Sequence, residues 1–225
     1  MKISVVVCAK NEEGYIENCL ECLKKQTLKP EIIVVDGHSK DNTFNISKRY
    51  ADKVVKDNKK GIADARNIGW KVAKGDVIAY CDADTLPPKD WVENISKLMG
   101  DKICISGPLI PYDGDTLMEI FFKIWTELVT WSFGLLITTY IWGPNMVFKR
   151  KILKNYQFRV NILEDYDLVK RIRKSGNVKF FRKLKMPVSA RHLKYGFHFS
   201  VLRFYVRNFL RLKFGFKEKS EDYWK

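Results

Sequence analysis

The chain has 225 residues, of which 46% are hydrophobic and 30% are charged. This length and balance suit one folded domain with a sizeable core, and they exclude a disordered or collagen-like chain. The formal net charge of +15 is unevenly distributed, because residues 1–148 hold 19 Lys and Arg against 20 Asp and Glu, while residues 149–225 hold 22 against 6. The positive charge of the C-terminal third therefore predicts an anionic partner. Charge alone does not decide whether that partner is nucleic acid, phosphate or a lipid surface.

Short β-branched runs alternate with amphipathic helical patterns over the first 110 residues. Apolar residues at steps of three and four indicate the helices, and Pro30, Gly75 and Pro87 lie at the joints. This alternation is typical of a parallel sheet with crossover helices, so we expect one α/β domain. The predicted strands are Ile3–Cys8, Glu31–Val35, Lys53–Val55, Val77–Cys81 and Ile103–Ser106, and the predicted helices are Glu13–Gln26, Asn42–Tyr50, Ile62–Ala73 and Lys89–Met99.

Five cysteines are scattered mostly inside apolar runs, with no secretory signal before them. This pattern predicts reduced thiols in a cytosolic protein. Cys19 and Cys22 form a lone C-x-x-C inside a helical pattern, and no second pair completes a zinc site. We therefore expect both to be packing residues.

The segment from Leu128 to Phe148 contains 21 residues without a charge, which is long enough to span a bilayer. The Gly143-Pro144-Asn145 sequence near its end breaks a helix and introduces polar groups that lipid would not satisfy. We therefore expect a buried or interfacial helix over residues 115–138, then a loop and a strand at Met146–Lys149. A transmembrane span is the less favoured alternative.

The tail over residues 191–225 interleaves aromatic residues with cations. Arg203, Arg207 and Arg211 recur every four residues, so a helix here would carry a basic stripe beside an aromatic face. This pattern predicts an interfacial helix on an anionic membrane surface; a core-packing helix with a solvated basic face is the alternative. We expect no nucleic-acid partner, because no zinc-finger spacing, RNP-type strand or helix-turn-helix punctuation accompanies the charge.

Carboxylates and amides follow three of the predicted strands. Ligands in open α/β sheets bind beyond the carboxyl ends of the parallel strands, so these positions would share one rim. Glu12 and Asp41 are also explained as acidic residues at helix N-termini. Asp36, Asp82 and Asp84 are harder to explain in this way, because each follows an apolar run where a buried carboxylate needs a partner.

Asp82 and Asp84 lie two residues apart, so both can face one hard divalent cation that also binds oxygens of a substrate diphosphate. An Asp-x-Asp triplet is weak by itself, because a turn residue and a helix cap explain it as well. No G-x-G-x-x-G follows a strand and no G-x-x-x-x-G-K-[ST] is present, so the sequence predicts neither a dinucleotide fold nor a P-loop.

Five sequence blocks follow one another over roughly residues 1–180. They are Val5–Glu12, Ile33–Thr43, Gly61–Gly69, Asp82–Asp84 and Glu164–Leu168, the last leading to Arg171 and Gly176. In these blocks and their order the chain resembles the family-2 glycosyltransferases, which invert the anomeric configuration of nucleotide sugars. The resemblance implies a single mononucleotide-binding, Rossmann-like domain of the GT-A type with a mostly parallel central sheet, which here would carry a basic helical C-terminal extension.

The resemblance also implies roles for individual residues. Asp165 would be the general base, with Glu164 beside it, although both also suit the acidic first turn of a helix. Asp84 and Asp82 would hold Mg²⁺ or Mn²⁺ against the diphosphate, with His192 as a weaker third ligand. The expected acceptor loop contains Trp142, Gly143 and Asn145, and the expected donor nucleotide-binding residues are Ala9, Asn11, Glu12, Asp36, Asp41, Arg66 near the diphosphate, and Asp82.

The chemistry of sugar transfer suits these side chains, because a divalent cation absorbs charge on the leaving diphosphate while a carboxylate takes the acceptor proton. The chain lacks the Gln-x-x-Arg-Trp element of processive synthases, so we expect transfer of a single sugar. The acceptor would be a glycan or lipid-linked group, and the protein would lie on the cytoplasmic side of the cell membrane. Residues 1–190 would form the transferase domain, with 1–110 as its nucleotide half and 111–190 as its acceptor half, followed by the tail 191–225.

Two other functions stay open from the residues. A nucleotidyltransferase also uses strand-end carboxylates and a divalent cation, but the Glu164-Asp165 block does not favour it. A catalytically degenerate, basic membrane-binding module would use the tail alone. Nucleotide binding and turnover separate these alternatives.

Overall fold

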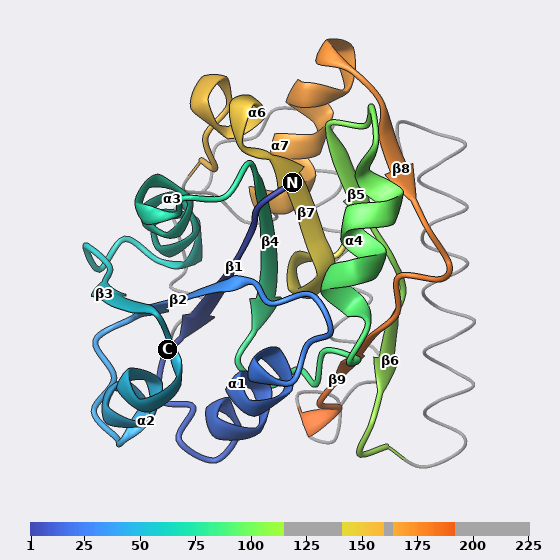
Figure 1. The fold of residues 1–225 in the computed structure, drawn as a ribbon. Coiled ribbons are helices and arrows are strands. Elements are labelled where there is room, and N and C mark those ends of the chain that lie inside the picture. Colours follow the sequence, from blue (N-terminus) through green and yellow to red (C-terminus); the bar gives the residue numbers. More distant parts are fainter. Residues whose placement is uncertain (115–140, 160–163, 192–225) are drawn as a thin grey trace, which may run out of the picture.

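The structure, a computed structural model, describes residues 1–114, 141–159 and 164–191. Within them, a seven-stranded sheet has the order β3-β2-β1-β4-β7-β5-β8, and a small sheet pairs β6 with β9 (Figure 1). Only β7 runs antiparallel to its neighbours in the described sheets, so the expected α/β fold with a mostly parallel sheet is confirmed. The strands are β1 (Ile3–Ala9), β2 (Glu31–Asp36), β3 (Lys53–Lys56), β4 (Val77–Asp82), β5 (Cys104–Ser106), β6 (Leu109–Pro111), β7 (Met146–Lys149), β8 (Val178–Phe180) and β9 (Met186–Val188).

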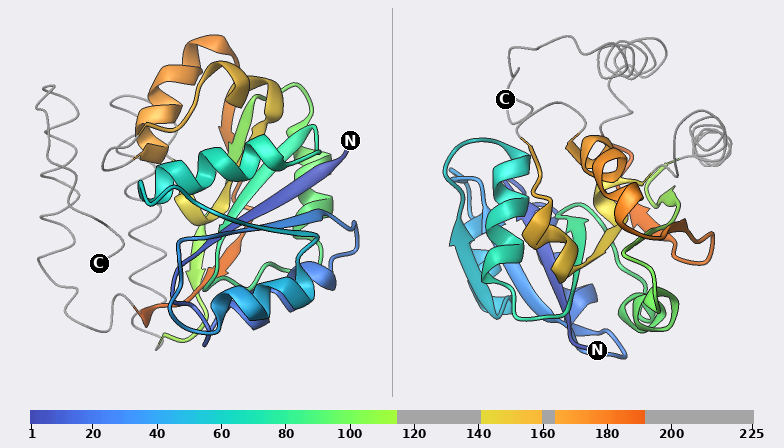
Figure 2. Two further views of the ribbon diagram at one scale, coloured as in Figure 1. Left: turned by 90° about the vertical axis from the view of Figure 1, so that its left-hand side faces the viewer. Right: turned by 90° about the horizontal axis from the view of Figure 1, so that it is seen from above.

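Two helical layers cover opposite faces of the large sheet (Figure 2). Val5 and Val7 of β1 pack in one core cluster with α1, α2 and α4, while Val6 and Cys8 pack in the other with α3, α6 and α7. Successive side chains of a strand point to opposite faces, so a strand covered on both faces is apolar throughout. The helices are α1 (Ile16–Lys24), α2 (Thr43–Tyr50), α3 (Ile62–Val72), α4 (Trp91–Met99), α6 (Arg150–Asn155) and α7 (Glu164–Ile172), with 3-10 turns η1 (Gly143–Asn145) and η2 (Arg173–Ser175).

The sequence located the central strands to within about a residue, but it placed the start of α1 wrongly. The helix expected from Glu13 begins at Ile16, because the amides of Tyr15 and Ile16 both donate to the carbonyl of Glu12 and form a turn there. The short strands β6, β8 and β9 were not predicted. Each has only three residues, and β6 and β9 each contain a proline, Pro111 and Pro187, which has no backbone N–H to donate and is uncommon inside a strand.

The structure confirms two further expectations, and two expected helices lie outside the residues that it describes. Cys19 is fully buried in the core, so its interpretation as a packing residue is confirmed. The Pro-containing turn and the strand at Met146–Lys149 are confirmed as η1 and β7. The helix expected over residues 115–138 and the tail helix beyond Arg191 lie outside the described residues. Among the residues that the structure describes, none of the helices has the length and apolar character needed to cross a bilayer.

Candidate active site

Three strands end side by side at one edge of the sheet. Ala9 of β1 is in register with Asp36 of β2, and Cys8 is in register with Asp82 of β4. The carboxyl ends of these parallel strands are where the sequence predicted the nucleotide site. Asp36 is fully buried, and both its carboxylate oxygens accept a hydrogen bond from the amide of Ser39 at 3.3 Å. Asp36 therefore shapes the turn after β2.

Asn11 and Asp41 join the loops that follow β1 and β2. Asn11 Oδ1 accepts a hydrogen bond from the amide of Lys40 at 2.8 Å, and Asn11 itself has a left-handed backbone with φ of 56°. Asp41 accepts from the amides of Glu13 at 3.1 Å and Thr43 at 3.0 Å. Burial raises the pKa of Asp41, but these hydrogen bonds outweigh it and hold the pKa below its usual value. The two loops are thus fixed before any ligand binds.

Arg66 of α3 connects carboxylates from both halves of the chain. Its Nη1 donates to Glu164 Oε1, and its Nη2 lies 3.8 Å from Asp82 Oδ1. A Cβ atom at Gly143 would lie 2.7 Å from Arg66 Nη2 and 3.5 Å from Asp165 Oδ2, so this position needs glycine beside the guanidinium. Arg66 is 4% exposed and neutralises the carboxylates that surround it, and its expected place near the diphosphate stays a prediction.

The same environment alters the pKa values of two carboxylates. Burial raises the pKa of Asp82 to about 7; Arg66 opposes this rise, while Asp84, Glu12 and Asp165 add to it. The Asp82 side chain still keeps 36% of its surface exposed, so a ligand can reach it. Burial also raises the pKa of Asp165, against the opposing effect of Arg66. A carboxylate with a raised pKa is a stronger base, as proton abstraction near neutral pH requires.

Glu164 and Asp165 lie both in the acidic first turn of a helix and at the candidate site, the two alternatives that the sequence left open. They are the first residues of α7, where acidic side chains interact favourably with the helix dipole, and they also border the buried Arg66. Asp165 Oδ1 accepts a hydrogen bond from the amide of Tyr166 at 2.7 Å. This hydrogen bond fixes the carboxylate at the N-terminal end of α7.

Asp82 and Asp84 suit a small divalent cation. They lie on a turn closed by Thr85, whose Oγ1 and amide both donate to the carbonyl of Asp82 at 2.8 and 3.2 Å. Within the described part of the chain, no three His, Cys, Asp or Glu side chains gather closely enough to enclose a metal. Mg²⁺ is usually bound by one or two carboxylates, and water and substrate phosphate fill its other coordination positions. Asp82 and Asp84 therefore fit such an ion. His192 lies outside the described residues.

Arg191 belongs to this site, although sequence reasoning overlooked it. Its Nη2 lies 2.5 Å from Glu12 Oε1 and 3.1 Å from Asp84 Oδ2, and its guanidinium stacks 4.3 Å from the centre of the Tyr15 ring. The segment after β9 is held there because the amide of Ser189 donates to the carbonyl of Asp84 at 3.0 Å. The resemblance pointed to the neighbouring His192, but it did not single out Arg191, and β9 itself was not predicted.

The expected acceptor residues are mostly structural. Trp142 is 7% exposed and packs in the core, which leaves little of its ring for a sugar. Asn145 is fully buried: its Oδ1 accepts from Trp91 Nε1 at 3.1 Å, and its Nδ2 donates to the carbonyl of Leu184 at 2.6 Å. Trp142 and Asn145 thus have structural contacts, Gly143 lies beside the Asp165 carboxylate, and the acceptor role of all three stays a prediction.

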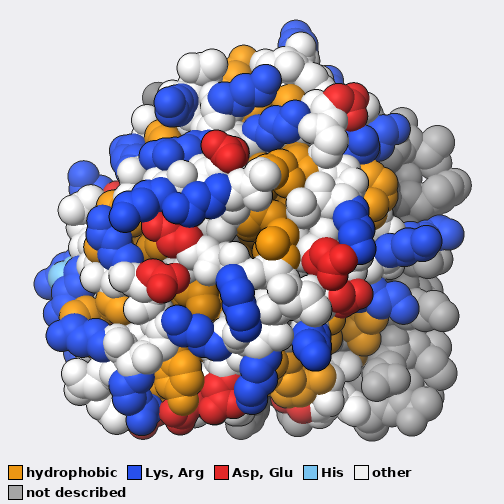
Figure 3. Space-filling view, viewed as in Figure 1, with side chains coloured by type: hydrophobic (Ala, Val, Ile, Leu, Met, Phe, Trp, Pro, Cys, Tyr) orange, Lys and Arg blue, Asp and Glu red, His pale blue; other side chains and the backbone are white. Residues whose placement is uncertain are grey.

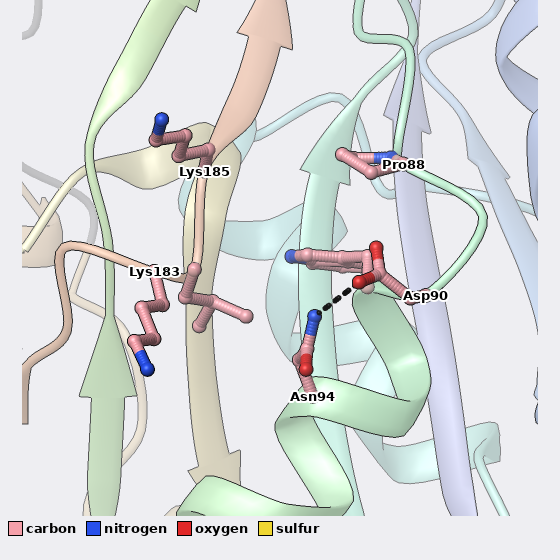
Figure 4. A pocket seen from close by; sticks show the side chains of 7 residues that line it. Pro88, Asp90, Asn94, Lys183 and Lys185 are labelled. Carbon is pink, nitrogen blue, oxygen red and sulfur yellow. Dashed lines mark hydrogen bonds between the residues drawn. The ribbon is translucent and has the colours of Figure 1, made fainter.

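A separate hollow of about 350 Å³ lies beside the start of α4, and its lining includes Trp91 and Leu184, which also bond Asn145 (Figure 4). Residues 183–185 lie across it from the start of α4, with the side chains of Lys183 and Lys185 pointing away from that helix, and Asn94 Nδ2 donates to Asp90 Oδ2 at 2.9 Å on the α4 side. None of the strand-end carboxylates lines this hollow. It is therefore distinct from the candidate active site.

The family described as glycosyl transferase family 2 matches residues 4–157. The chain is 35% identical over 106 residues to the putative glycosyltransferase EpsH of Bacillus subtilis, covering 44% of this chain and 31% of that protein. It is 32% identical over 168 residues to the poly(ribitol-phosphate) beta-glucosyltransferase of Bacillus spizizenii, covering 68% of this chain and 26% of that protein. The alignments thus cover less than half the length of these relatives.

One solved structure is similar over nearly the whole chain. It is the mannosyltransferase PcManGT from Pyrobaculum calidifontis in complex with GDP-Man and Mn²⁺, with a TM-score of 0.74. The similarity covers 97% of this chain and 65% of that one at 22% identity. At this identity the comparison shows the fold, which is that of the GT-A enzymes expected from the sequence.

Substitution of Arg66 tests the buried charge network. Arg66→Gln leaves Glu164 without its partner, and we expect a loss of about 3–5 kcal/mol in the free energy of unfolding, measured by urea denaturation. The double variant Arg66→Gln/Glu164→Gln should recover part of that loss, because it removes the uncompensated charge. Arg49→Gln breaks the exposed pair with Glu17 and should cost less than about 1 kcal/mol. Equal losses for Arg66→Gln and Arg49→Gln would contradict the network.

Proposed function

Because the chain belongs to glycosyltransferase family 2, we propose that it transfers one sugar from a nucleoside-diphosphate sugar to an acceptor, using the strand-end carboxylates as its active site. The observation that carries this proposal is the meeting of Asp82, Glu164 and Asp165 around the buried Arg66. Asp82 lies far from Glu164 and Asp165 in the sequence. Their meeting at one rim suits a reaction in which one group binds near the leaving group and another takes the proton.

The donor would bind at the loops after β1 and β2. Ala9, Asn11, Glu12, Asp36 and Asp41 lie on these loops or at the strand ends from which they start. Hydrogen bonds within the protein already fix the loops, so a nucleotide would bind with little further ordering of the backbone. The similar structure in complex with GDP-Man and Mn²⁺ supports a donor of this chemical class.

Asp84 and Asp82 would hold Mg²⁺ or Mn²⁺. The bound cation supplies positive charge to the leaving diphosphate, which is the chemistry that carboxylates alone cannot provide. Asp82 would in addition face the ribose. Burial is the main cause of its raised pKa, and the carboxylates of Asp84, Glu12 and Asp165 add to it; this concentration of negative charge favours binding of a cation.

Asp165 would remove the proton of the acceptor hydroxyl. The acceptor oxygen forms a bond to the anomeric carbon as the bond from that carbon to the diphosphate breaks, and the proton moves to the Asp165 carboxylate. A single displacement of this kind inverts the anomeric configuration. Glu164 is paired with Arg66, so we assign it to holding the guanidinium in place rather than to proton transfer.

The acceptor would be anionic or presented on an anionic membrane surface. Residues 141–159 and 164–191 hold 14 Lys and Arg against 3 Asp and Glu. Lys and Arg side chains spread over the upper part of the molecule in Figure 3, where Figure 1 places α6. Poly(ribitol-phosphate), in the name of one relative, is itself a phosphate polymer. We place the protein at the cytoplasmic face of the cell membrane, with a lipid-linked or glycan acceptor.

Nucleotide binding tests the donor site. The melting temperature is measured with UDP, GDP, CMP and dTDP, each with and without Mn²⁺. One nucleotide should raise it and the others should not. A ligand at 100 times its dissociation constant adds about 2.7 kcal/mol to the stability of the folded state, which is enough to detect as a shift. Mn²⁺ should enlarge that shift in the wild-type protein and should not do so in Asp84→Ala. A folded protein that responds to none of the nucleotides would contradict the proposal and favour the degenerate membrane module.

The assignment of Asp165 is tested by turnover with water as the acceptor. Asp165→Asn should slow the release of nucleoside diphosphate from the preferred nucleotide sugar by about 10²–10⁴-fold, while the thermal shift caused by the nucleotide stays unchanged. Asp64→Asn, on the exposed side of α3, is a control that should keep wild-type turnover. Unchanged turnover in Asp165→Asn would remove the general-base assignment.

Vesicle binding tests the anionic surface. The full chain should sediment with vesicles that contain anionic lipid and much less with neutral vesicles, because each cation near such a surface contributes about 1 kcal/mol. The binding should weaken as salt concentration rises. Equal binding to both kinds of vesicle would contradict an electrostatic membrane contact.

A further inference from the structure

Arg191 occupies the place at Asp84 that a cation would need. One guanidinium nitrogen, Nη2, contacts both Glu12 Oε1 and Asp84 Oδ2, at 2.5 and 3.1 Å. The face of the guanidinium rests on the Tyr15 ring at 4.3 Å. The side chain is 22% exposed, and the two carboxylates are 16% and 13% exposed, so the pair is largely shielded from water. Shielding of this kind strengthens the interaction between opposite charges.

The backbone that carries Arg191 is fixed independently of its side chain. The amide of Ser189 donates to the carbonyl of Asp84 at 3.0 Å, and the amide of Ala190 donates to Asp113 Oδ1 at 2.5 Å. Ser189 Oγ donates to Asp113 Oδ2 at 2.7 Å. The guanidinium can therefore leave Asp84 by rotation of its own side chain while residues 189 and 190 stay in place.

A divalent cation on Asp84 Oδ2 would lie against the guanidinium of Arg191. A small cation such as Mg²⁺ binds a carboxylate oxygen at about 2.0–2.1 Å, which would bring two or more positive charges within contact distance of the guanidinium. The guanidinium thus neutralises the Asp84 carboxylate in this structure, and its positive charge repels a divalent cation.

We propose that Arg191 competes with the divalent cation for Asp84, so that the protein binds the cation weakly until a nucleoside diphosphate is present. This inference rests on the proposed function, because it takes Asp84 as the cation site. The negative charge of the diphosphate gives the displaced guanidinium a new partner. Cation and nucleotide then favour each other's binding, as thermodynamic linkage requires.

The test measures Mn²⁺ binding to the full chain by isothermal titration calorimetry without nucleotide. Arg191→Gln should bind Mn²⁺ about 5-fold or more tightly than the wild type, which is the lower end of typical coupling between sites. Arg191→Lys, which keeps the charge but loses the planar fork, should fall between the two. Arg49→Gln removes the same charge from an exposed pair and should match the wild type.

Further measurements separate the possible failures. Adding Asp84→Asn to Arg191→Gln should abolish the gain in Mn²⁺ affinity, which places the ion at Asp84. Circular dichroism should show that each variant is folded. If the wild type binds Mn²⁺ with nucleotide but Arg191→Gln gains nothing without it, the competition is wrong and the proposed function stands. If Mn²⁺ binds to none of the proteins even with nucleotide, the metal site of the proposed function is wrong as well.

Discussion

The buried contact between Arg66 and Glu164 is the interaction on which the arrangement of the site depends. It joins α3 to the start of α7 across 98 residues of sequence, and Asp82 and Asp165 border the same guanidinium. Carboxylates brought together in a protein interior repel one another and lose hydration, so their convergence requires a positive charge among them. Arg66 provides it, and the absence of a side chain at Gly143 leaves room for the guanidinium.

A second arginine neutralises carboxylates at the outer side of the same rim. Glu12 and Asp84 face Arg191, which comes from the far end of the described chain. The two arginines differ in how firmly they are held: Arg66 is 4% exposed and packed near the Phe158 ring, whereas Arg191 is partly exposed. A buried arginine suits a permanent structural charge, and a partly exposed one suits a charge that ligands displace. The site thus combines a fixed inner cation with an exchangeable outer one.

The sequence predicted the ends of β1, β2 and β4 better than the surroundings of Trp142 and Asn145, for a physical reason. The strands β1, β2 and β4 are covered on both faces, so each is a continuous apolar run whose end is easy to locate, and the polar residues that follow are brought together by parallel register alone. Trp142 and Asn145 carried no comparable information. A tryptophan or asparagine in a turn suits a ligand or a core equally, and only the contacts of Asn145 with Trp91 and Leu184 show that it is structural.

The sequence by itself determined the alternation of strands and helices, the family to which the chain belongs and the carboxylates at the strand ends. These follow from local hydrophobic periodicity and from blocks of adjacent residues. The tertiary structure decided which cation lies beside which carboxylate: it placed Arg66 among Asp82, Glu164 and Asp165, and it brought Arg191 to Asp84 through the bridge of Val188 with Thr85 and the hydrogen bond of Ser189 with Asp84. Ion pairs between residues about 100 or more positions apart depend on how the chain folds back on itself, and no local pattern of sequence records that.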